Sequence, residues 1–297
     1  MFTVTVILPA RNEAKNLPDL LQDIRQQSFG RGVELIQILV LSDGSTDTTV
    51  SVVKQAAIED SRITVRAFRT SKGKAVRLNQ AFRQSTTDAV LILDADIRLP
   101  SKTALRTLLA PVKKGTADLT SATVIASNNQ TWVQKMLTVS MEFKQAAYAA
   151  WKQGNNIYTC HGRARALSQR FYQHLLLQHS YNEDSFSYLA CVSKDLRYQF
   201  VQAVQIHYTL PKIFSDHVLQ SERFFISTDL LSRSFPDELV HNELAIPKLI
   251  LVRHFIHAVA QHPVWMTLYV CTTFYTYIHS KLFREIRHSW QMATTSK

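Results

Sequence analysis

Four short strand-like runs separated by helix-like segments constrain the fold of this chain more than any other feature. The runs are Phe2–Leu8, Glu34–Leu41, Arg62–Phe68 and Ala89–Leu93. Helices are expected between and after them, at about 16–28, 46–58 and 73–85. A strand that alternates with a helix in this way predicts an α/β fold with a mostly parallel sheet and right-handed crossovers.

Polar clusters follow each of these runs, where the predicted strands end. The clusters are Pro9-Ala10-Arg11-Asn12-Glu13, Ser42-Asp43-Gly44-Ser45-Thr46-Asp47, Ser71-Lys72-Gly73-Lys74 and Asp94-Ala95-Asp96. Ligands of open parallel sheets lie beyond the carboxyl ends of the strands, near a change in strand order. The clusters are therefore expected at one edge of the sheet. Gly44 and Gly73 belong to a set of only 7 glycines, which favours constrained backbone there.

The two carboxylates of Asp94 and Asp96 come directly after the most apolar run, Ala89–Leu93. Residues two apart on an extended chain point the same way, so their charges would repel unless a cation lies between them. A hard divalent cation that also contacts phosphate is the usual partner. The alternative is a turn or a helix N-cap, since aspartate favours both.

Composition narrows the class of protein. The 297 residues can bury one large core or two smaller ones, and 34 basic against 23 acidic residues give a net charge of +11. Such a surplus favours anionic partners. The three cysteines form no paired motif, which predicts a reducing compartment, and strand-like sequence from Phe2 onward leaves no room for a signal peptide.

The ordered clusters resemble those of family 2 glycosyltransferases, which have the GT-A fold, a Rossmann-like sheet flanked by helices. The resemblance covers roughly the first hundred residues. It implies that the first three clusters hold the nucleotide of a sugar donor, UDP being favoured, and that the D-x-D pair binds Mn²⁺ or Mg²⁺ against its diphosphate. Implied donor-binding residues are Pro9, Glu13, Asp43, Lys74 and Asp94, and the implied metal ligands are Asp96 and Asp94.

The resemblance continues in the second half of the chain. Asn182-Glu183-Asp184 precedes a helical stretch expected over Ser185–Leu196, and acidic residues there also suit an ordinary helix N-terminus. The family carries an E-D pair at about this distance, which implies Asp184 as the general base and Glu183 as an acceptor-side residue. It also often has a Gly-containing turn at the position of Thr159–Ala164, which implies that Gly162 lines the acceptor. The implied reaction is a direct, inverting displacement that releases a nucleoside diphosphate.

A degenerate Q-x-x-R-W segment follows in the sequence Gln220-Ser221-Glu222-Arg223-Phe224. The resemblance implies that Gln220 borders the acceptor channel and that Arg223 approaches the diphosphate. A guanidinium suits phosphate because its fork donates two parallel hydrogen bonds. The alternative is an amphipathic helix with a solvated charged face.

We expect a catalytic domain over residues 1–235, with a donor half to about 115, and a helical segment over 236–297. Leu244–Val259 and Val264–Ile278 are amphipathic or too short to span a bilayer, and they either lie on an anionic membrane surface or pack on the catalytic domain. The helix expected at Trp132–Trp151 has the same two readings. A cytoplasmic protein, peripheral at the inner face of the membrane, is expected.

The favoured function is sugar transfer to a lipid or a growing glycan. A sugar nucleotidyltransferase is the second hypothesis, although Pro9–Leu17 lacks the Gly-rich loop it would need. The third is a non-catalytic anion-binding module. Nucleic acid is not an expected partner because Lys and Arg are spread along the chain. A dehydrogenase is disfavoured because no G-x-G-x-x-G occurs.

Overall fold

The structure is a computed structural model that describes residues 1–127, 130–178 and 182–282, with side chains outside the description at 222–230 and 280–282. The chain divides into two compact units. Among the described residues, the first comprises Met1–Ile125 with Cys160–Tyr208, and the second comprises Ala126–Thr159 with Thr209–Leu282. The predicted boundary at residue 235 between a catalytic domain and a helical segment stays a prediction.

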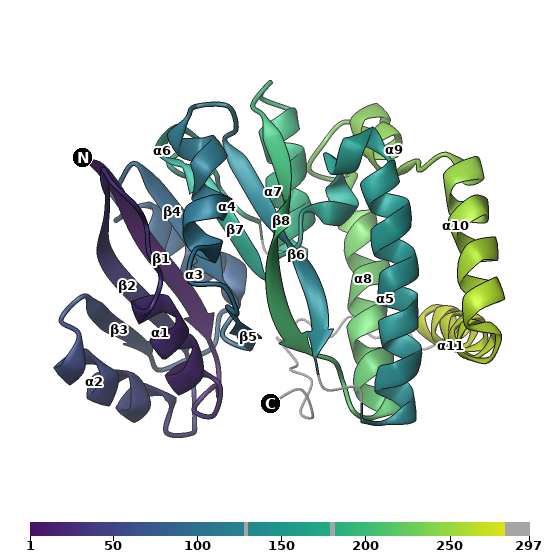
Figure 1. The fold of residues 1–297 in the computed structure, drawn as a ribbon, viewed down its shortest axis with the longest axis horizontal. Coiled ribbons are helices and arrows are strands. Elements are labelled where there is room, and N and C mark those ends of the chain that lie inside the picture. The colour runs from purple at the N-terminus through teal and green to yellow at the C-terminus, as the bar shows by residue number, and fades with distance from the viewer. Residues whose placement is uncertain (128–129, 179–181, 283–297) are drawn as a thin grey trace. The chain divides into compact units, whose positions relative to one another are not determined.

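The first unit is built on an eight-stranded sheet with the order β3-β2-β1-β4-β7-β6-β8-β5 (Figure 1). The strands are β1 (Phe2–Ala10), β2 (Val33–Asp43), β3 (Ile63–Phe68), β4 (Ala89–Leu93), β5 (Ile97–Arg98), β6 (Leu119–Ser127), β7 (Ala164–Ser168) and β8 (Tyr198–Thr209). The strands expected from the apolar runs are thus β1 to β4. They pair in parallel, as predicted.

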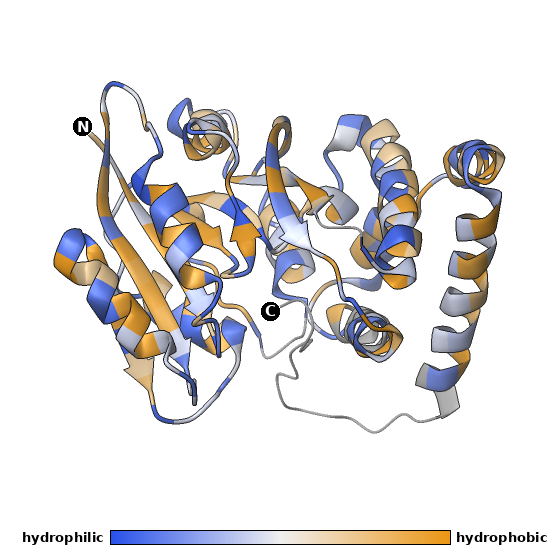
Figure 2. Cartoon of the chain, turned by 60° about the horizontal axis from the view of Figure 1, so that its bottom comes forward, coloured by the Kyte–Doolittle hydropathy of each residue, from blue (hydrophilic) through white to orange (hydrophobic). Residues whose placement is uncertain are grey.

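The centre of this sheet is hydrophobic on both faces. Every residue of β4 is buried, and so is β1 from Val4 to Ala10. A strand covered on both faces reads as a continuous apolar run, which is why the sequence of Ala89–Leu93 identified β4 so clearly. Figure 2 shows hydrophobic residues running along the strands of this sheet.

The other half of the sheet is antiparallel. β7 pairs antiparallel with β4 and with β6, and β5 pairs antiparallel with β8. The fold is therefore mixed α/β, and β1 to β4 form its parallel half, in agreement with the predicted class. The strand order reverses between β1 and β4, because β2 and β3 lie on one side of β1 and β4 lies on the other. Ligands of open α/β sheets bind at such a reversal.

Helices connect and cover these strands. They are α1 (Leu17–Arg25), α2 (Thr49–Glu59), α3 (Lys74–Phe82), α4 (Ala104–Lys113), α6 (Gln169–Tyr172) and α7 (Glu183–Val192). α1 shows how such a helix is packed: it buries Leu17, Leu20, Leu21 and Ile24, which recur at helical spacing. Contacts of α2 with β3, α3 with β1, and α4 with β4 and β7 close the core.

The second unit is helical where the structure describes it, apart from strand ends shared with the sheet. Its elements are α5 (Trp132–Ala150), the 3₁₀ turns η1 (Lys152–Gly154) and η2 (Ile157–Thr159), α8 (Phe214–Leu231), α9 (Asp237–Leu244), α10 (Lys248–Gln261) and α11 (Pro263–Leu282). Met266, Val139 and Ala258 join α11, α5 and α10 in a hydrophobic cluster. No helix in the described part of the chain has both the length and the hydropathy required to cross a bilayer.

Candidate active site at the β1/β4 reversal

Asp43, at the end of β2, is fully buried and organises the loop before α3. Its carboxylate accepts hydrogen bonds from the Ser71 hydroxyl (2.7 Å), from the backbone N–H groups of Lys72 (3.0 Å) and Gly73 (2.9 Å), and from Arg77 Nε (2.5 Å). Burial alone would raise the pKa of Asp43, but these donors lower it below its ordinary value. The second and third polar clusters are thus physically joined.

The loop after β1 is joined to the loop after β2. Asn12 has a positive φ of 53°, and its side-chain oxygen accepts from the Thr46 N–H at 2.8 Å, while its own N–H donates to Ser45 Oγ at 3.1 Å. Glu13 follows with a buried side chain, and its N–H donates to Thr49 Oγ1 at 2.8 Å. The first two clusters therefore form one wall, as expected for strand ends that share an edge.

Asp94 and Asp96 lie on a turn between β4 and β5 and not on extended chain, because β4 ends at Leu93. The expectation from strand geometry that their side chains are parallel was therefore wrong. Their charges are nevertheless close: burial and the negative charge of Asp94 raise the pKa of Asp96 to about 6, and Glu13 adds to this, while Arg163 opposes it. Glu13 and Asp96 thus belong to one electrostatic site.

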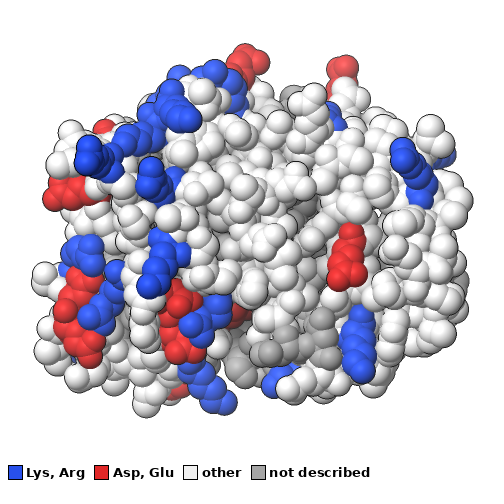
Figure 3. All heavy atoms as spheres, in the orientation of Figure 1, with Lys and Arg blue, Asp and Glu red and all other residues white. Residues whose placement is uncertain are grey.

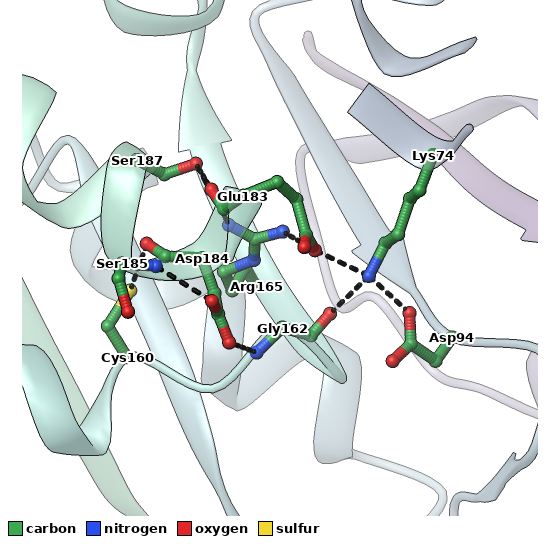
Figure 4. Close-up of polar contacts among 9 residues, drawn as sticks. All are labelled: Lys74, Asp94, Cys160, Gly162, Arg165, Glu183, Asp184, Ser185 and Ser187. Carbon is green, nitrogen blue, oxygen red and sulfur yellow. Dashed lines mark hydrogen bonds and ion pairs between the residues drawn. The ribbon is translucent and has the colours of Figure 1, made fainter. Parts of the chain in front are cut away.

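Lys74, in the first turn of α3, connects this turn to the acceptor-side acids (Figure 4). Its Nζ lies 2.6 Å from Asp94 Oδ1 and 2.5 Å from Glu183 Oε1, and it donates to the Gly162 carbonyl at 3.3 Å. Burial alone would lower the pKa of Lys74, but the two carboxylates raise it above its ordinary value. Lys74 is therefore charged and held between the predicted donor and acceptor sides.

Asp184 faces Gly162 (Figure 4). Its Oδ2 accepts from the Gly162 N–H at 3.0 Å, and its Oδ1 accepts from the Ser185 N–H at 2.8 Å. A Cβ on Gly162 would lie 3.0 Å from Glu183 Oε1 and 3.2 Å from Asp184 Oδ2, so a larger residue would require both acidic side chains to shift by a few tenths of an ångström. Burial and the charge of Glu183 raise the pKa of Asp184 above its ordinary value.

The helix that carries these acids begins earlier than predicted. α7 starts at Glu183, after Asn182, so Glu183 and Asp184 lie in its first turn and do not precede it. Acidic residues favour this position because the N-terminal end of a helix is partially positive. The position of both acids in the first turn of a helix is therefore compatible with their predicted roles, which stay predictions.

The structure places the remaining predicted residues as follows. Pro9 is a buried residue of β1 that pairs with Leu41 of β2, beside the loop that leads to Glu13. Gln220 lies on α8 in the second unit and is partly buried, and its proposed acceptor role stays a prediction. The side chain of Arg223 lies outside the described residues.

Three arginines in or next to this site were not singled out from the sequence. Arg77 is 2 % exposed and binds Asp43; Arg163 stacks on Tyr208 at 3.7 Å; Arg165 is fully buried and binds Glu183. A signal existed for Arg165, because it interrupts the apolar run of β7, and a charge in such a run requires a buried partner.

The residues at this turn fit a divalent cation that is shared with a substrate. Asp94 and Asp96 offer hard oxygen ligands, and the pKa of Asp96 is raised first by burial and then by the negative charge of Asp94, which a bound cation would offset. Within the described ranges, no group of three or more His, Cys, Asp or Glu residues is arranged to hold an ion. Ions that bind through one or two carboxylates take their remaining ligands from substrate phosphates and water.

The profile of Glycosyl transferase family 2 matches residues 5–176, more than half of the chain. With the mixed sheet and the D-x-D turn at the β1/β4 reversal, this match defines a GT-A type transferase fold. The chain belongs to glycosyl transferase family 2.

Individual relatives match over shorter ranges. Over 108 residues the chain is 29% identical to 4,4'-diaponeurosporenoate glycosyltransferase of Staphylococcus haemolyticus, covering 36% of this chain and 28% of that protein. Over 113 residues it is 29% identical to undecaprenyl-phosphate 4-deoxy-4-formamido-L-arabinose transferase of Proteus mirabilis, covering 38% of this chain and 34% of the relative. The chain thus spans about a third or less of the length of these relatives.

A solved structure is similar over nearly the whole chain. Mannosyltransferase PcManGT from Pyrobaculum calidifontis, in complex with GDP-Man and Mn²⁺, has a TM-score of 0.62 and 19% sequence identity. The match covers 96% of this chain and 81% of the mannosyltransferase. At this identity the likeness shows the fold alone.

Proposed function

We propose that this chain transfers a sugar, with inversion, from a nucleotide-diphosphate sugar to a hydroxyl acceptor. One observation carries the proposal: Lys74 joins the D-x-D turn at the strand-order reversal to the acidic start of α7. The predicted donor carboxylates and the predicted base therefore face one locus. Family membership supports the same chemistry.

Asp184 is the proposed general base. As the acceptor oxygen bonds to the anomeric carbon, the bond from that carbon to the diphosphate oxygen breaks, the nucleoside diphosphate leaves with the electron pair, and the hydroxyl proton passes to Asp184. A carboxylate with a raised pKa is a better base near neutral pH than an ordinary aspartate. The Gly162 and Ser185 N–H groups fix its orientation.

The donor side has complementary roles. The wall around Asp43 and Glu13 is proposed to hold the nucleotide, and Asp96 with Asp94 is proposed to hold Mn²⁺ or Mg²⁺. When bound, the ion neutralises charge that develops on the leaving diphosphate. Because Asp94 is already paired with Lys74, we propose Asp96 as the stronger metal ligand.

A nucleotide-release screen tests this function. UDP-glucose, UDP-N-acetylglucosamine and GDP-mannose are each incubated with the protein and Mn²⁺, Mg²⁺ or EDTA, and released UDP or GDP is measured. We expect release from a UDP-sugar that needs the metal, is lost in Asp96→Ala, and falls at least about 100-fold in Asp184→Asn, which retains UDP binding. Full release by Asp96→Ala or Asp184→Asn would contradict the assigned roles.

The acceptor is proposed to be a lipid or a glycan at the cytoplasmic face of a membrane. The name of the Proteus mirabilis relative includes undecaprenyl phosphate, which supports a lipid-linked acceptor. α11 packs through Met266 against α5, and it also exposes apolar residues. Packing on the protein and contact with a membrane surface, which the sequence left as alternatives, are therefore compatible in this one helix. The exposed apolar residues of α10 and α11 are Leu249, Val252, Phe255, Ile256, Val264, Leu268, Val270, Phe274, Tyr275, Tyr277 and Ile278.

The spacing of these residues supports a membrane-facing surface. Leu249, Val252 and Ile256 follow one stripe of α10, since residues three and four apart share a helix face. On the face in Figure 3, Lys and Arg gather mainly at the upper left, and several other basic groups lie beside Asp or Glu. We propose that apolar contact contributes to membrane binding alongside the net charge of +11.

A further inference from the structure

Arg165 is a charged residue in the middle of the sheet. It lies in β7, where it pairs with Ile92 of β4 and Ser121 of β6, and its side chain is 0 % exposed. Taking a guanidinium out of water costs several kcal/mol unless it is well paired. The presence of a buried Arg165 is therefore explained by the residues that bind its guanidinium group.

Those partners lie on the first turn of α7. Arg165 Nη2 donates to Glu183 Oε1 at 3.0 Å, and Nη1 donates to Ser187 Oγ at 2.9 Å and to the Glu183 carbonyl at 3.4 Å. Ser187 in turn donates to the same carbonyl at 2.6 Å. Glu183 and Ser187 are one helical turn apart, so the guanidinium group binds α7 at two successive turns (Figure 4).

The same Glu183 oxygen continues the contact to the donor side. It lies 2.5 Å from Lys74 Nζ, which lies 2.6 Å from Asp94 Oδ1. Arg165, Glu183, Lys74 and Asp94 thus form a line of alternating charges, which we call the charge line, whose two positive and two negative members balance. Asp184 and Asp96 stand next to this line but are not members of it.

We propose that Arg165 is a positioning residue for sugar transfer, which acts through Glu183 to hold Asp184 in register with the D-x-D turn. This inference rests on the proposed function, because it takes Asp184 as the base. Two contacts connect α7 to the chain segment around β7. Arg165 of β7 binds Glu183, and the N–H of Gly162, three residues before Arg165, donates to Asp184, the residue after Glu183. Arg165 itself touches no reacting atom.

Arg165→Lys is the decisive variant. Lysine keeps the charge but has one nitrogen in place of the two, Nη1 and Nη2, that separately bind Ser187 and Glu183, so it cannot reproduce the planar, two-nitrogen contact. A small displacement of a reacting group is enough to cost about ten- to 100-fold in rate. We expect kcat for nucleotide release to fall at least about ten-fold while the donor KM and UDP binding with Mn²⁺ change less than about two-fold.

The matched control is Arg170→Lys. Arg170 forms an ion pair with Asp118 at 2.5 Å in the same unit, outside the candidate site. We expect this variant to retain wild-type kcat. Because Arg170 is 61% exposed and Arg165 is 0% exposed, Arg165→Lys should lose more thermal stability than Arg170→Lys. A loss of kcat in Arg165→Lys alone, measured at a temperature at which both variants are folded, supports the proposal. Wild-type kcat in Arg165→Lys overturns it.

A double variant separates positioning from folding. Arg165→Gln leaves the line one negative charge in excess, and adding Glu183→Gln restores the balance. We expect the double variant to regain the thermal stability that Arg165→Gln loses, while its kcat stays below that of Glu183→Gln alone, because the contact of Arg165 with α7 is also missing. Recovery of kcat in step with stability would show a merely structural role. If Arg165→Gln does not fold, the lysine variant and the double variant still decide.

The pH profile of kcat gives an independent readout. The charged or titratable groups that face Asp184 are Glu183 on its own helix, Arg165 from β7, Lys74 from α3, and the Cys160 thiol. Loss of the Arg165 charge in Arg165→Gln should move the acidic limb of the kcat profile to higher pH, while Arg165→Lys leaves it in place. Acidic limbs that are unchanged in both variants overturn the proposal.

A wild-type protein that releases nucleotide from no donor refutes the proposed function, whereas an active wild type with an unaffected Arg165→Lys refutes this inference alone.

Discussion

At the scale of single residues, buried ionic groups in the first unit are each held by several partners. Asp43 accepts from donors on four residues, and Glu183 binds both Lys74 and Arg165. A buried carboxylate is stable only when its partners replace the water it has lost. Removal of one member therefore affects both local stability and the position of its neighbours.

Asp43→Asn should destabilise the protein strongly. The change leaves the buried Arg77 without its carboxylate, and breaking a buried pair in this way costs about 3–5 kcal/mol. Because the folded-state pKa of Asp43 is lowered, its stabilising charge is fully present above the unfolded-state pKa of about 3.9 and is lost as the pH falls through the folded-state value. Urea denaturation at pH 7 and at lower pH measures both effects.

Asp60→Asn is the control for this prediction. Asp60 also has a lowered pKa, but its partner Arg62 is 42% exposed, so the pair should contribute less than about 1 kcal/mol. The two variants should also differ in how steeply the free energy of unfolding falls with decreasing pH. This pH dependence should be weakened more by Asp43→Asn than by Asp60→Asn. Equal losses at pH 7 would show that burial of Asp43 is not the cause.

Gly162→Ala should impair catalysis more than stability. The new methyl group would lie within 3.2 Å of carboxylate oxygens of Glu183 and Asp184 and would push the proposed base away. We expect kcat for nucleotide release to fall at least about ten-fold. Gly115→Ala is the control, because its φ of +68° makes alanine cost about 1 kcal/mol, while no atom lies near the added methyl. Equal kcat in the two variants would contradict the steric argument.

At the scale of elements, local sequence patterns predicted the parallel half of the sheet and part of the site. The contacts of Asp43 with Lys72 and Gly73 follow from strand ends that share an edge, a rule that needs only element order. The contact of Lys74 with Glu183 does not follow from it. That contact depends on β7 pairing antiparallel with β4 and on where α7 begins, and neither is encoded in a local period.

The N-terminus of α5 offers a test at this scale. Thr131 and Gln134 form a reciprocal capping box, with Thr131 Oγ1 accepting the Gln134 N–H at 3.2 Å. Thr131→Ala should lower the free energy of unfolding by about 1 kcal/mol, and Thr131→Ser should restore most of it. Urea denaturation measures both, and equal stability of the alanine and serine variants would contradict the capping role.

At the scale of the whole molecule, the proposed membrane surface makes a prediction about partitioning. The protein should sediment with phosphatidylglycerol vesicles at about 50 mM salt and less so at about 500 mM, because screening weakens the attraction of a +11 chain to anionic lipid. Leu249→Glu with Ile256→Glu should reduce binding at both salt concentrations, since both side chains are more than half exposed on α10.

Ile58→Glu is the matched control for that experiment. Ile58 is 78% exposed on α2 of the first unit, so Ile58→Glu makes the same chemical change as Ile256→Glu alone, one added negative charge, on a surface with no proposed lipid contact, and these two single variants are compared. We expect Ile58→Glu to sediment like the wild type. If Ile58→Glu loses as much vesicle binding as the α10 variant Ile256→Glu, the loss is explained by net charge and not by the α10 surface. If the wild type does not sediment with vesicles at low salt, the proposed membrane surface is refuted.

The position of β4 has a consequence for synthesis on the ribosome. β4 is completely buried, yet one of its two neighbours, β7, begins at Ala164, well after β4 ends at Leu93. While the intervening chain is being made, β4 presents an open hydrophobic edge, which is a template for pairing with other chains. The nascent protein therefore needs shielding in this interval, and ribosome-bound chains halted before Ala164 should crosslink to holdase chaperones more than chains halted after Ser168.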